Sequence, residues 1–379
     1  MPSATDDSAM DTVTPPVGGP VGSPGGVAAK RRRQAWNYVA VLALVSALAT
    51  GPILVTNSYY RYAGVLMVMY MVMATSWNLV GGFTGYVSLG HAAFFGFGAY
   101  CTGIIANDSR SSVILALLAT VGICLAVAAV IGVVALRVRG SSFVIVTIAL
   151  VYMGSLLAQG LRSLTGGSRG LDVAGLYTFS TRAARHGAYI VTFAVLLGVV
   201  MFLWNFIDGT KFGMGLKAVR EDEDRAQSLG VNTTAFKVVA FALSATFVGL
   251  AGGLYATWTG FIDPIFVFSV QISAQLVLMT LLGGMRSLWG PVLGAAIIVP
   301  SGEFFLVNLP EYHLVSMGVM LGTVVMLMPN GIIPTLRRLW DRRNPPAASI
   351  RELAGSVGAL DTDDADVERR AGAPRAVRA

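Results

Sequence analysis

The charged side chains best suited to binding a partner lie in one short segment, residues 208–237, which separates two long apolar stretches. Its centre, Gly215–Gly230, carries four consecutive acids, Glu221–Asp224, followed by Arg225. Acids near the start of a helix and a glycine just after its end are both stabilising, so this order predicts a short helix. Such a segment is suited to recognition rather than catalysis.

One side of the predicted helix is apolar. Val219, Ala226 and Leu229 recur at intervals of seven and three, which places them on a single stripe. A stripe of this size suits a groove on a soluble partner. The alternative, a helix lying on the membrane surface, would favour a basic polar face, and the four acids argue against it.

A second set of polar residues lies within an apolar, glycine-rich stretch, residues 78–100. Asn78, Thr84, Ser88 and His91 offer hydrogen bonds without fixed charge. They could contact a small neutral or zwitterionic solute that crosses the membrane, or they could hold one helix against another. Because no acid lies near His91 in the sequence, a structural histidine is favoured over a proton relay.

Glu303 is the single carboxylate inside a predicted membrane span. An acid within a membrane is a functional candidate. It also lies about one turn from the predicted outer end of its helix, where a side chain can reach water. The sequence leaves both the functional and the interfacial interpretation open.

The composition identifies the class of protein that holds these residues. Of the 379 residues, 55% are hydrophobic and 12% are charged, whereas soluble proteins have about 25% charged residues. This predicts an all-α integral membrane protein. The net charge of +7 fits arginines beside membrane spans and needs no nucleic-acid partner. Both cysteines, Cys101 and Cys124, lie in apolar runs, so no disulfide framework is indicated.

The sequence contains no recognisable catalytic residues and no metal site. It also lacks the phosphate-binding Gly-x-x-x-x-Gly-Lys-Ser/Thr motif. We therefore expect a transporter subunit, not an enzyme, and any nucleotide hydrolysis must be carried by another chain.

Apolar runs of about 20 residues predict ten membrane spans, with eight as the alternative. The predicted spans are roughly 37–57, 62–80, 86–106, 112–136, 141–160, 188–207, 238–258, 271–284, 290–308 and 313–331. The run 271–284 is short and fits either a full helix or a re-entrant segment. The break between the second and third spans is expected at Asn78, Gly81, Gly82, Thr84 and Gly85.

Two glycine-broken segments resemble each other and indicate a weak internal twofold repeat. Leu79–Gly82 is followed by Gly85, Ser88 and Gly90, and Leu281–Gly284 by Ser287, Gly290 and Gly294. In transporters such paired breaks tend to line the path of the solute, so Gly283 and Gly284 join the predicted translocation path. Chance similarity between glycine-rich sequences is the alternative.

Basic residues set the predicted orientation. Lys30–Arg33 precedes the first span and places the N-terminus in the cytoplasm, and ten crossings then put segment 208–237 and the C-terminus there too. The chain divides into a disordered N-terminal tail (1–35), a transmembrane domain (36–336) and a C-terminal tail (337–379).

Several motifs together identify a family. They are Gly81–Tyr100, Leu136–Gly140 with Val146-Thr147, Leu164–Leu171, Ala218–Glu221 through Ala226 to Gly230–Asn232, Ala251–Tyr255 and Leu282–Pro291. With these motifs, residues 62–335 resemble the permease subunits of branched-chain amino acid ABC importers, the LivM/LivH family, and in particular its LivM-like branch.

The resemblance implies a permease that imports branched-chain amino acids across the cytoplasmic membrane of a prokaryote by ATP-driven alternating access. The implied partners are a second, similar permease, two cytoplasmic ATPase subunits, an extracytoplasmic solute-binding protein and membrane lipid. ATP and Mg would be bound by the ATPases, and this chain would bind no cofactor. The coupling segment that docks on the ATPase in this family matches Gly215, Val219, Arg220, Glu221, Arg225, Ala226, Leu229 and Gly230.

One position departs from the family pattern, because Tyr152 stands about where many members carry a glutamate, and its effect on specificity is open. Urea and short-chain amide permeases belong to the same superfamily and are an alternative. An ion-coupled secondary transporter would favour acids and histidines at mid-membrane, and this chain offers only His91 and Glu303. A structural or signalling membrane component would leave the glycine-broken segments unexplained.

Overall fold

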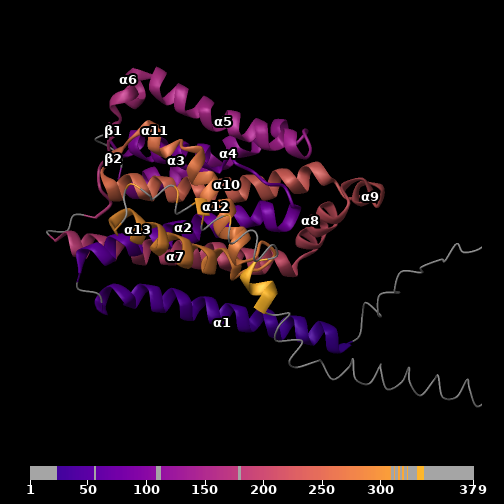
Figure 1. The fold of residues 1–379 in the computed structure, drawn as a ribbon. Helices are drawn as coiled ribbons and strands as arrows, with labels where there is room; N and C mark the ends of the chain where they lie inside the picture. The colour runs from indigo at the N-terminus through magenta and orange to yellow at the C-terminus, as the bar shows by residue number, and fades with distance from the viewer. Residues whose placement is uncertain are drawn as a thin grey trace, which may run out of the picture.

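The computed structural model describes residues 24–54, 57–107, 112–177, 181–308 and 331–336, with isolated positions between 311 and 322. Long helices dominate, and most lie side by side along a common direction (Figure 1). They are α1 (Pro24–Leu54), α2 (Ser58–Thr84), α3 (His91–Ala106), α4 (Val113–Ala135), α5 (Ser141–Gly160), α7 (Arg182–Gly209), α10 (Thr233–Thr259), α12 (Val270–Gly283) and α13 (Gly290–Asn308).

Short elements gather at the two ends of this bundle (Figure 1). At one end lie α6 (Arg162–Thr165), the 3-10 helix η1 (Gly167–Arg169), α11 (Pro264–Val267), and the two-residue strands β1 (Leu171–Asp172) and β2 (Phe261–Ile262). The strands pair antiparallel, with Leu171 opposite Ile262. At the other end lie α8 (Lys211–Glu221) and α9 (Glu223–Ser228).

Within the described residues, seven segments are long and apolar enough to cross a membrane, and α3 and α13 are shorter apolar helices. The all-α membrane fold predicted from the composition is therefore confirmed. Pro264–Gly283, which combines α11 and α12, is long enough for a full crossing. Most of the predicted tenth span, 313–331, lies outside the described residues, as do the predicted C-terminal tail and residues 1–23.

Two predicted boundaries were wrong. Helix α1 begins at Pro24, inside the predicted N-terminal tail, because the Ala, Lys and Arg residues that precede the span are good helix formers. Helix α2 runs unbroken through Gly81 and Gly82 to Thr84, and only Gly85, with a φ of 76°, ends it.

Gly81 and Gly82 serve close packing rather than unwinding. A Cβ on Gly81 would overlap the ring of Trp77, and one on Gly82 would overlap the side-chain oxygen of Asn78 and the carbonyl oxygen of Met285. Gly82 therefore lets α2 lie against the loop that follows α12, Gly81 leaves room for the Trp77 ring, and the helix has no need to break there.

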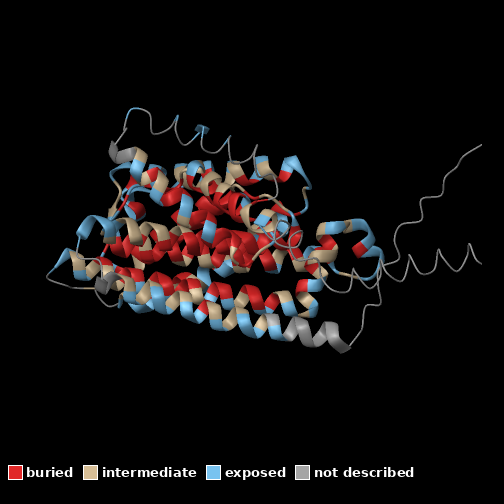
Figure 2. Ribbon diagram, turned by 60° about the horizontal axis from the view of Figure 1, so that its bottom comes forward, coloured by how far each residue is buried: buried red, intermediate tan, exposed pale blue. Residues whose placement is uncertain are grey.

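Helix α10 lies at the centre of the bundle and packs against α2, α3 and α4. Its contact with α3 is made by small residues: a Cβ on Gly98 would overlap the carbonyl oxygen of Gly249, and one on Gly252 that of Phe95. Such close backbone approach is how helices associate in membranes, where the lipid offers no hydrophobic drive between them. The most buried residues follow these central helices, and exposed positions lie outside (Figure 2).

Candidate functional site

The charged segment folds as two helices, not as the single amphipathic helix that the sequence predicts. Asp222 interrupts the helix with extended backbone (φ −160°, ψ 110°), and its carboxylate accepts hydrogen bonds from the backbone N–H groups of Asp224 and Arg225. An aspartate in this position caps the N-terminus of α9. The run of four acids therefore contains a helix boundary.

The two helices keep part of the predicted apolar stripe against the bundle. Val219 and Ala226 are buried, together with Leu216. Gly215 also faces the interior, since a Cβ there would overlap the ring of Phe236. Leu229, predicted to share the stripe, is instead 84% exposed and lies just past the last residue of α9, Ser228.

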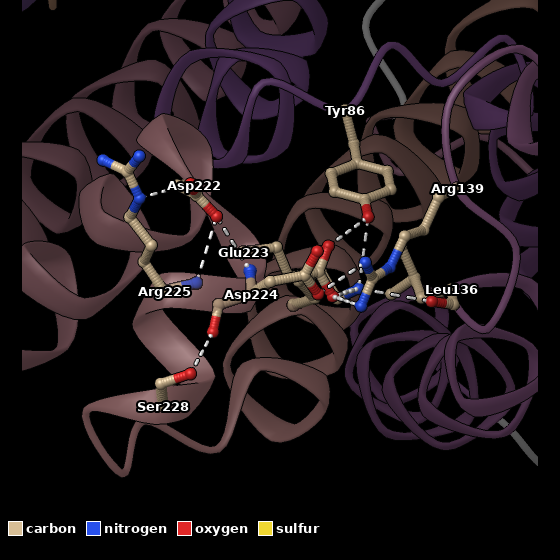
Figure 3. A network of polar contacts seen from close by, with 9 residues as sticks. Tyr86, Leu136, Arg139, Asp222, Glu223, Asp224, Arg225 and Ser228 are labelled. Carbon is tan, nitrogen blue, oxygen red and sulfur yellow. Dashed lines mark hydrogen bonds and ion pairs between the residues drawn. The ribbon is translucent and has the colours of Figure 1, made fainter.

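Glu223 is the centre of a polar network that fixes α9 to the bundle (Figure 3). Its carboxylate accepts a hydrogen bond from Lys237 Nζ at 2.6 Å and one from the Tyr86 hydroxyl at 2.6 Å. Lys237, near the start of α10, also donates to the carbonyl oxygen of Leu136 at 3.3 Å. Arg139 lies 3.5 Å from Glu223 and 2.8 Å from Asp224.

Three other parts of the chain therefore meet at α9. Tyr86 comes from the loop between α2 and α3, Leu136 and Arg139 from the loop between α4 and α5, and Lys237 from α10. The ammonium of Lys237 also lies 4.8 Å from the centre of the Tyr86 ring, a favourable cation–π distance.

Burial and neighbouring groups determine the protonation states of Glu223 and Tyr86. Burial raises the pKa of the Glu223 carboxyl, but hydrogen bonds from Lys237 and Tyr86 and the nearby charge of Arg139 lower it by more, so the pKa lies below its ordinary value. Burial, together with the hydrogen bond to Glu223, raises the pKa of Tyr86. At neutral pH the glutamate is charged and the tyrosine is neutral, as the hydrogen bond between them requires.

Helix α8 is tied to the end of α2. Arg220 donates from Nη1 to the carbonyl oxygen of Gly82 at 2.9 Å and pairs with Glu221 at 2.8 Å. Lys217 pairs with Asp208 and lies 5.8 Å from the centre of the Phe83 ring. The charged segment and the end of the glycine-rich helix are thus in direct contact, which the sequence alone did not predict.

The remaining predicted coupling residues face outward. Glu221, Arg225, Leu229 and Gly230 are all exposed. Arg225 bonds within its own turn, to Asp222 at 2.9 Å. The structure thus separates the predicted set into anchors that face the bundle and residues that are free to meet another protein.

The predicted path residues are packed among themselves. His91 is fully buried, with Ser88 Oγ 3.1 Å from Nδ1 and Ser244 Oγ 2.8 Å from Nε2. Thr84 donates to the carbonyl oxygen of Val80 one turn earlier. The His91–Ser244 bond joins α3 to α10, and Ser244 donates in turn to the carbonyl oxygen of Ser76 on α2 at 2.6 Å, which fits the structural interpretation of His91.

Asn78 links the two glycine-broken segments. Its Nδ2 donates to the carbonyl oxygen of Ser287 at 3.0 Å, while its Oδ1 is buried without a hydrogen-bond partner among the described residues. Gly283 and Gly284 end α12, and Gly284 has a φ of 116°, so here the chain does unwind as predicted. The two halves of the proposed repeat therefore lie against each other.

The sequence reasoning missed four members of the polar network: Tyr86, Arg139, Glu223 and Lys237. All four lie inside motifs or segments that the sequence analysis did single out, but none of these patterns names a partner. Within the part of the chain that the structure describes, no group of three or more His, Cys, Asp or Glu residues could hold a metal ion.

Comparisons with known proteins place these features in a family. A family model described as "Branched-chain amino acid transport system / permease component" matches residues 60–325. The high-affinity branched-chain amino acid transport system permease protein LivM of Salmonella typhimurium is 28% identical over 322 residues, covering 78% of this chain and 75% of that protein. LivM of Escherichia coli gives the same identity and coverage.

A second kind of relative also matches. The permease protein LivH of Salmonella typhimurium is 27% identical over 282 residues, covering 70% of this chain and 91% of that protein. No solved structure matches the chain significantly. Because the family model covers nearly all of the central helix bundle, the chain belongs to the family of permease components of branched-chain amino acid transport systems, and it is LivM-like.

Proposed function

We propose that this chain is one permease subunit of an ATP-driven importer that carries branched-chain amino acids across the cytoplasmic membrane of a prokaryote. A LivH-like second permease would complete the pathway, and a solute-binding protein outside would deliver the substrate. Two ATPase subunits would bind ATP and Mg on the cytoplasmic side, where both termini of this chain would lie. The subunits would alternate between outward-open and inward-open states.

The observation that carries this proposal is the form of the α8–α9 segment. It projects from one end of the bundle (Figure 1) and presents Leu229 with 84% of its surface exposed. A large exposed apolar side chain on a protruding, well-anchored segment is typical of a surface that another protein covers. The mixed charges of Glu221 and Arg225 beside it would fix the orientation of that partner.

The same segment is built to transmit motion. Its buried network joins it to α10 and to the loops after α2 and α4, and Arg220 joins it to the end of α2. A displacement of α8 and α9 by moving ATPase subunits would therefore be passed to several helices at once. Rigid-body movement of packed elements of this kind is a common switching mechanism.

The test is uptake of radiolabelled leucine and urea by cells that lack their own importers and express this chain with its partner subunits. We compare wild type with Leu229→Asp, whose side chain is exposed and can change without disturbing the core. Leu164→Asp, the same substitution at the exposed α6 on the opposite end, is the control. Ala226 is unsuitable because it is buried.

We expect ATP-dependent leucine uptake that falls about tenfold or more in Leu229→Asp, as the loss of a central interface residue commonly costs, and that persists in Leu164→Asp. Urea uptake in place of leucine would assign the chain to the urea and amide permeases. Leucine uptake without any ATPase subunit, unaffected by Leu229→Asp, would instead point to an ion-coupled carrier and end the importer proposal.

A further inference from the structure

A cavity of about 280 Å³ lies between α2, α10, α12 and α13. It is found near the bundle end opposite α8 and α9, because Tyr62 at the start of α2 and Tyr255 near the end of α10 both line it. Cavities that hold drug-sized ligands have volumes of roughly 300–1,000 Å³. This one is therefore of a size for a single small solute.

Glu303 of α13 lines this cavity and is partly buried there. The hydroxyl of Tyr59 donates to its Oε2 at 3.3 Å. Among the described residues that line the cavity there is no lysine or arginine, and none of the ion pairs that the described residues form involves Glu303. A partly buried carboxylate without a cationic side chain beside it is a site where a cationic ligand group would be stabilised.

The rest of the lining divides into polar and apolar groups. Gln275 and the tyrosines Tyr62, Tyr70 and Tyr255 supply an amide, hydroxyl groups and aromatic faces. Aromatic faces attract an ammonium group, and hydroxyl and amide N–H groups can donate to a carboxylate. Val299, which is buried, contributes to an apolar wall.

The cavity also extends toward the middle of α2 and the end of α12. Tyr70 follows Tyr62 by eight residues on α2, which is about 12 Å further into the bundle. Met279, another lining residue, lies one turn before the end of α12 at Gly283, and a Cβ on Gly294 would overlap its carbonyl oxygen. The inner end of the cavity therefore lies about one turn of α12 away from the unwound connection between α12 and α13.

We propose that this cavity binds the solute in transit as a zwitterion. The Glu303 carboxylate takes its ammonium group, Gln275 and the tyrosine hydroxyls take its carboxylate, and the apolar wall takes a branched side chain. The inference rests on the proposed function, which supplies the amino acid as cargo. It assigns to this chain a step of recognition separate from that of any solute-binding protein.

The experiment is equilibrium binding of radiolabelled leucine to the purified full complex in detergent, without the solute-binding protein. Glu303→Gln removes the charge at nearly constant shape, Glu303→Asp retains it, and Val299→Trp fills the cavity. Glu311→Gln, the same substitution at an exposed position outside the lining, is the matched control. Competition with 3-methylbutylamine, which lacks the carboxylate, and 4-methylpentanoate, which lacks the ammonium, reports which group the site holds.

We expect Glu303→Gln to weaken leucine binding about tenfold or more, since hydrogen bonds to charged groups are the strong ones. We also expect it to abolish competition by the amine while leaving competition by the acid unchanged. Val299→Trp should weaken leucine and both competitors, Glu303→Asp should retain binding, and Glu311→Gln should match wild type. Equal thermal unfolding temperatures would show that the variants are folded.

Unchanged leucine binding in Glu303→Gln would overturn the proposal, as would leucine binding that requires Na⁺, because the carboxylate would then serve a metal cation. The absence of binding in a wild-type complex that imports leucine with ATP would overturn it too, and the import function would stand. Loss of ATP-dependent leucine uptake in wild type would instead contradict the proposed function itself.

Discussion

Lys237 and Glu223 form an ion pair that is almost fully withdrawn from water, with 3% and 12% of their side chains exposed. Taking two charges out of water is costly, and the pair is tolerable because Tyr86 and the Leu136 carbonyl satisfy the remaining hydrogen bonds. The value of such a pair lies less in stability than in fixing one geometry for α9.

We predict that Lys237→Met lowers the free energy of unfolding by roughly 3 kcal/mol, the lower end of the range for breaking a buried ion pair, because the Glu223 carboxylate loses its closest cation and keeps only Arg139, at 3.5 Å. The double variant Lys237→Met with Glu223→Gln should recover a large part of this loss, since no unpaired charge then remains. Thermal unfolding of the purified protein measures both. Equal losses in the single and double variants would contradict this explanation, and the single variant Glu223→Gln completes the cycle that measures the coupling energy of the two charges.

At the scale of elements, α3 and α10 are positioned by glycines. Gly98 of α3 faces Gly249 of α10 so closely that a methyl group has no room. We predict that Gly98→Ala costs about 1–3 kcal/mol, the usual range for over-packing, and lowers the unfolding temperature. Gly122→Ala in α4 is the control, because a Cβ there meets nothing within 4 Å, and equal behaviour of the two variants would contradict the packing argument.

Helix boundaries differ in how well the sequence predicts them. Helices α4, α5 and α13 lie within a residue or two of their predicted limits, because uninterrupted apolar length determines a membrane helix. The break at Asp222 was hidden in a run of acids, since capping depends on backbone geometry that a charge pattern does not report. Gly82 and Gly284 look alike in sequence, yet only Gly284 unwinds its helix.

The sequence predicts the position of the charged segment but not the residues that anchor it. A short charged segment between apolar stretches can be located from the sequence alone, and its role as a recognition element stays a prediction. Its anchors are not identifiable in this way, because Tyr86 and Glu223 are 137 residues apart, and only the folded chain brings them together. Glu303 could be noticed in the sequence, but the cavity beside it could not.

For the whole molecule, Arg220 joins the charged end of the bundle to the end of α2. We predict that Arg220→Gln lowers leucine uptake about tenfold, corresponding to the loss of one charge-assisted hydrogen bond, while ATP hydrolysis by the partner subunits changes less than twofold. Uptake and hydrolysis are measured in the same proteoliposomes. Arg162→Gln at the opposite end is the control, and a parallel fall in both activities would show that Arg220 is not part of the link.

Helix α1 makes its principal contact with α7, and only 6% of its apolar window is buried within the chain. The ribosome synthesises α1 well before α7. The helix that packs against α1 therefore does not yet exist when α1 enters the membrane. Helix α1 must enter the lipid alone, and its apolar surface makes that possible. The later bond between Asn37 and Asn205, at 3.2 Å, then joins α1 to a bundle assembled beside it.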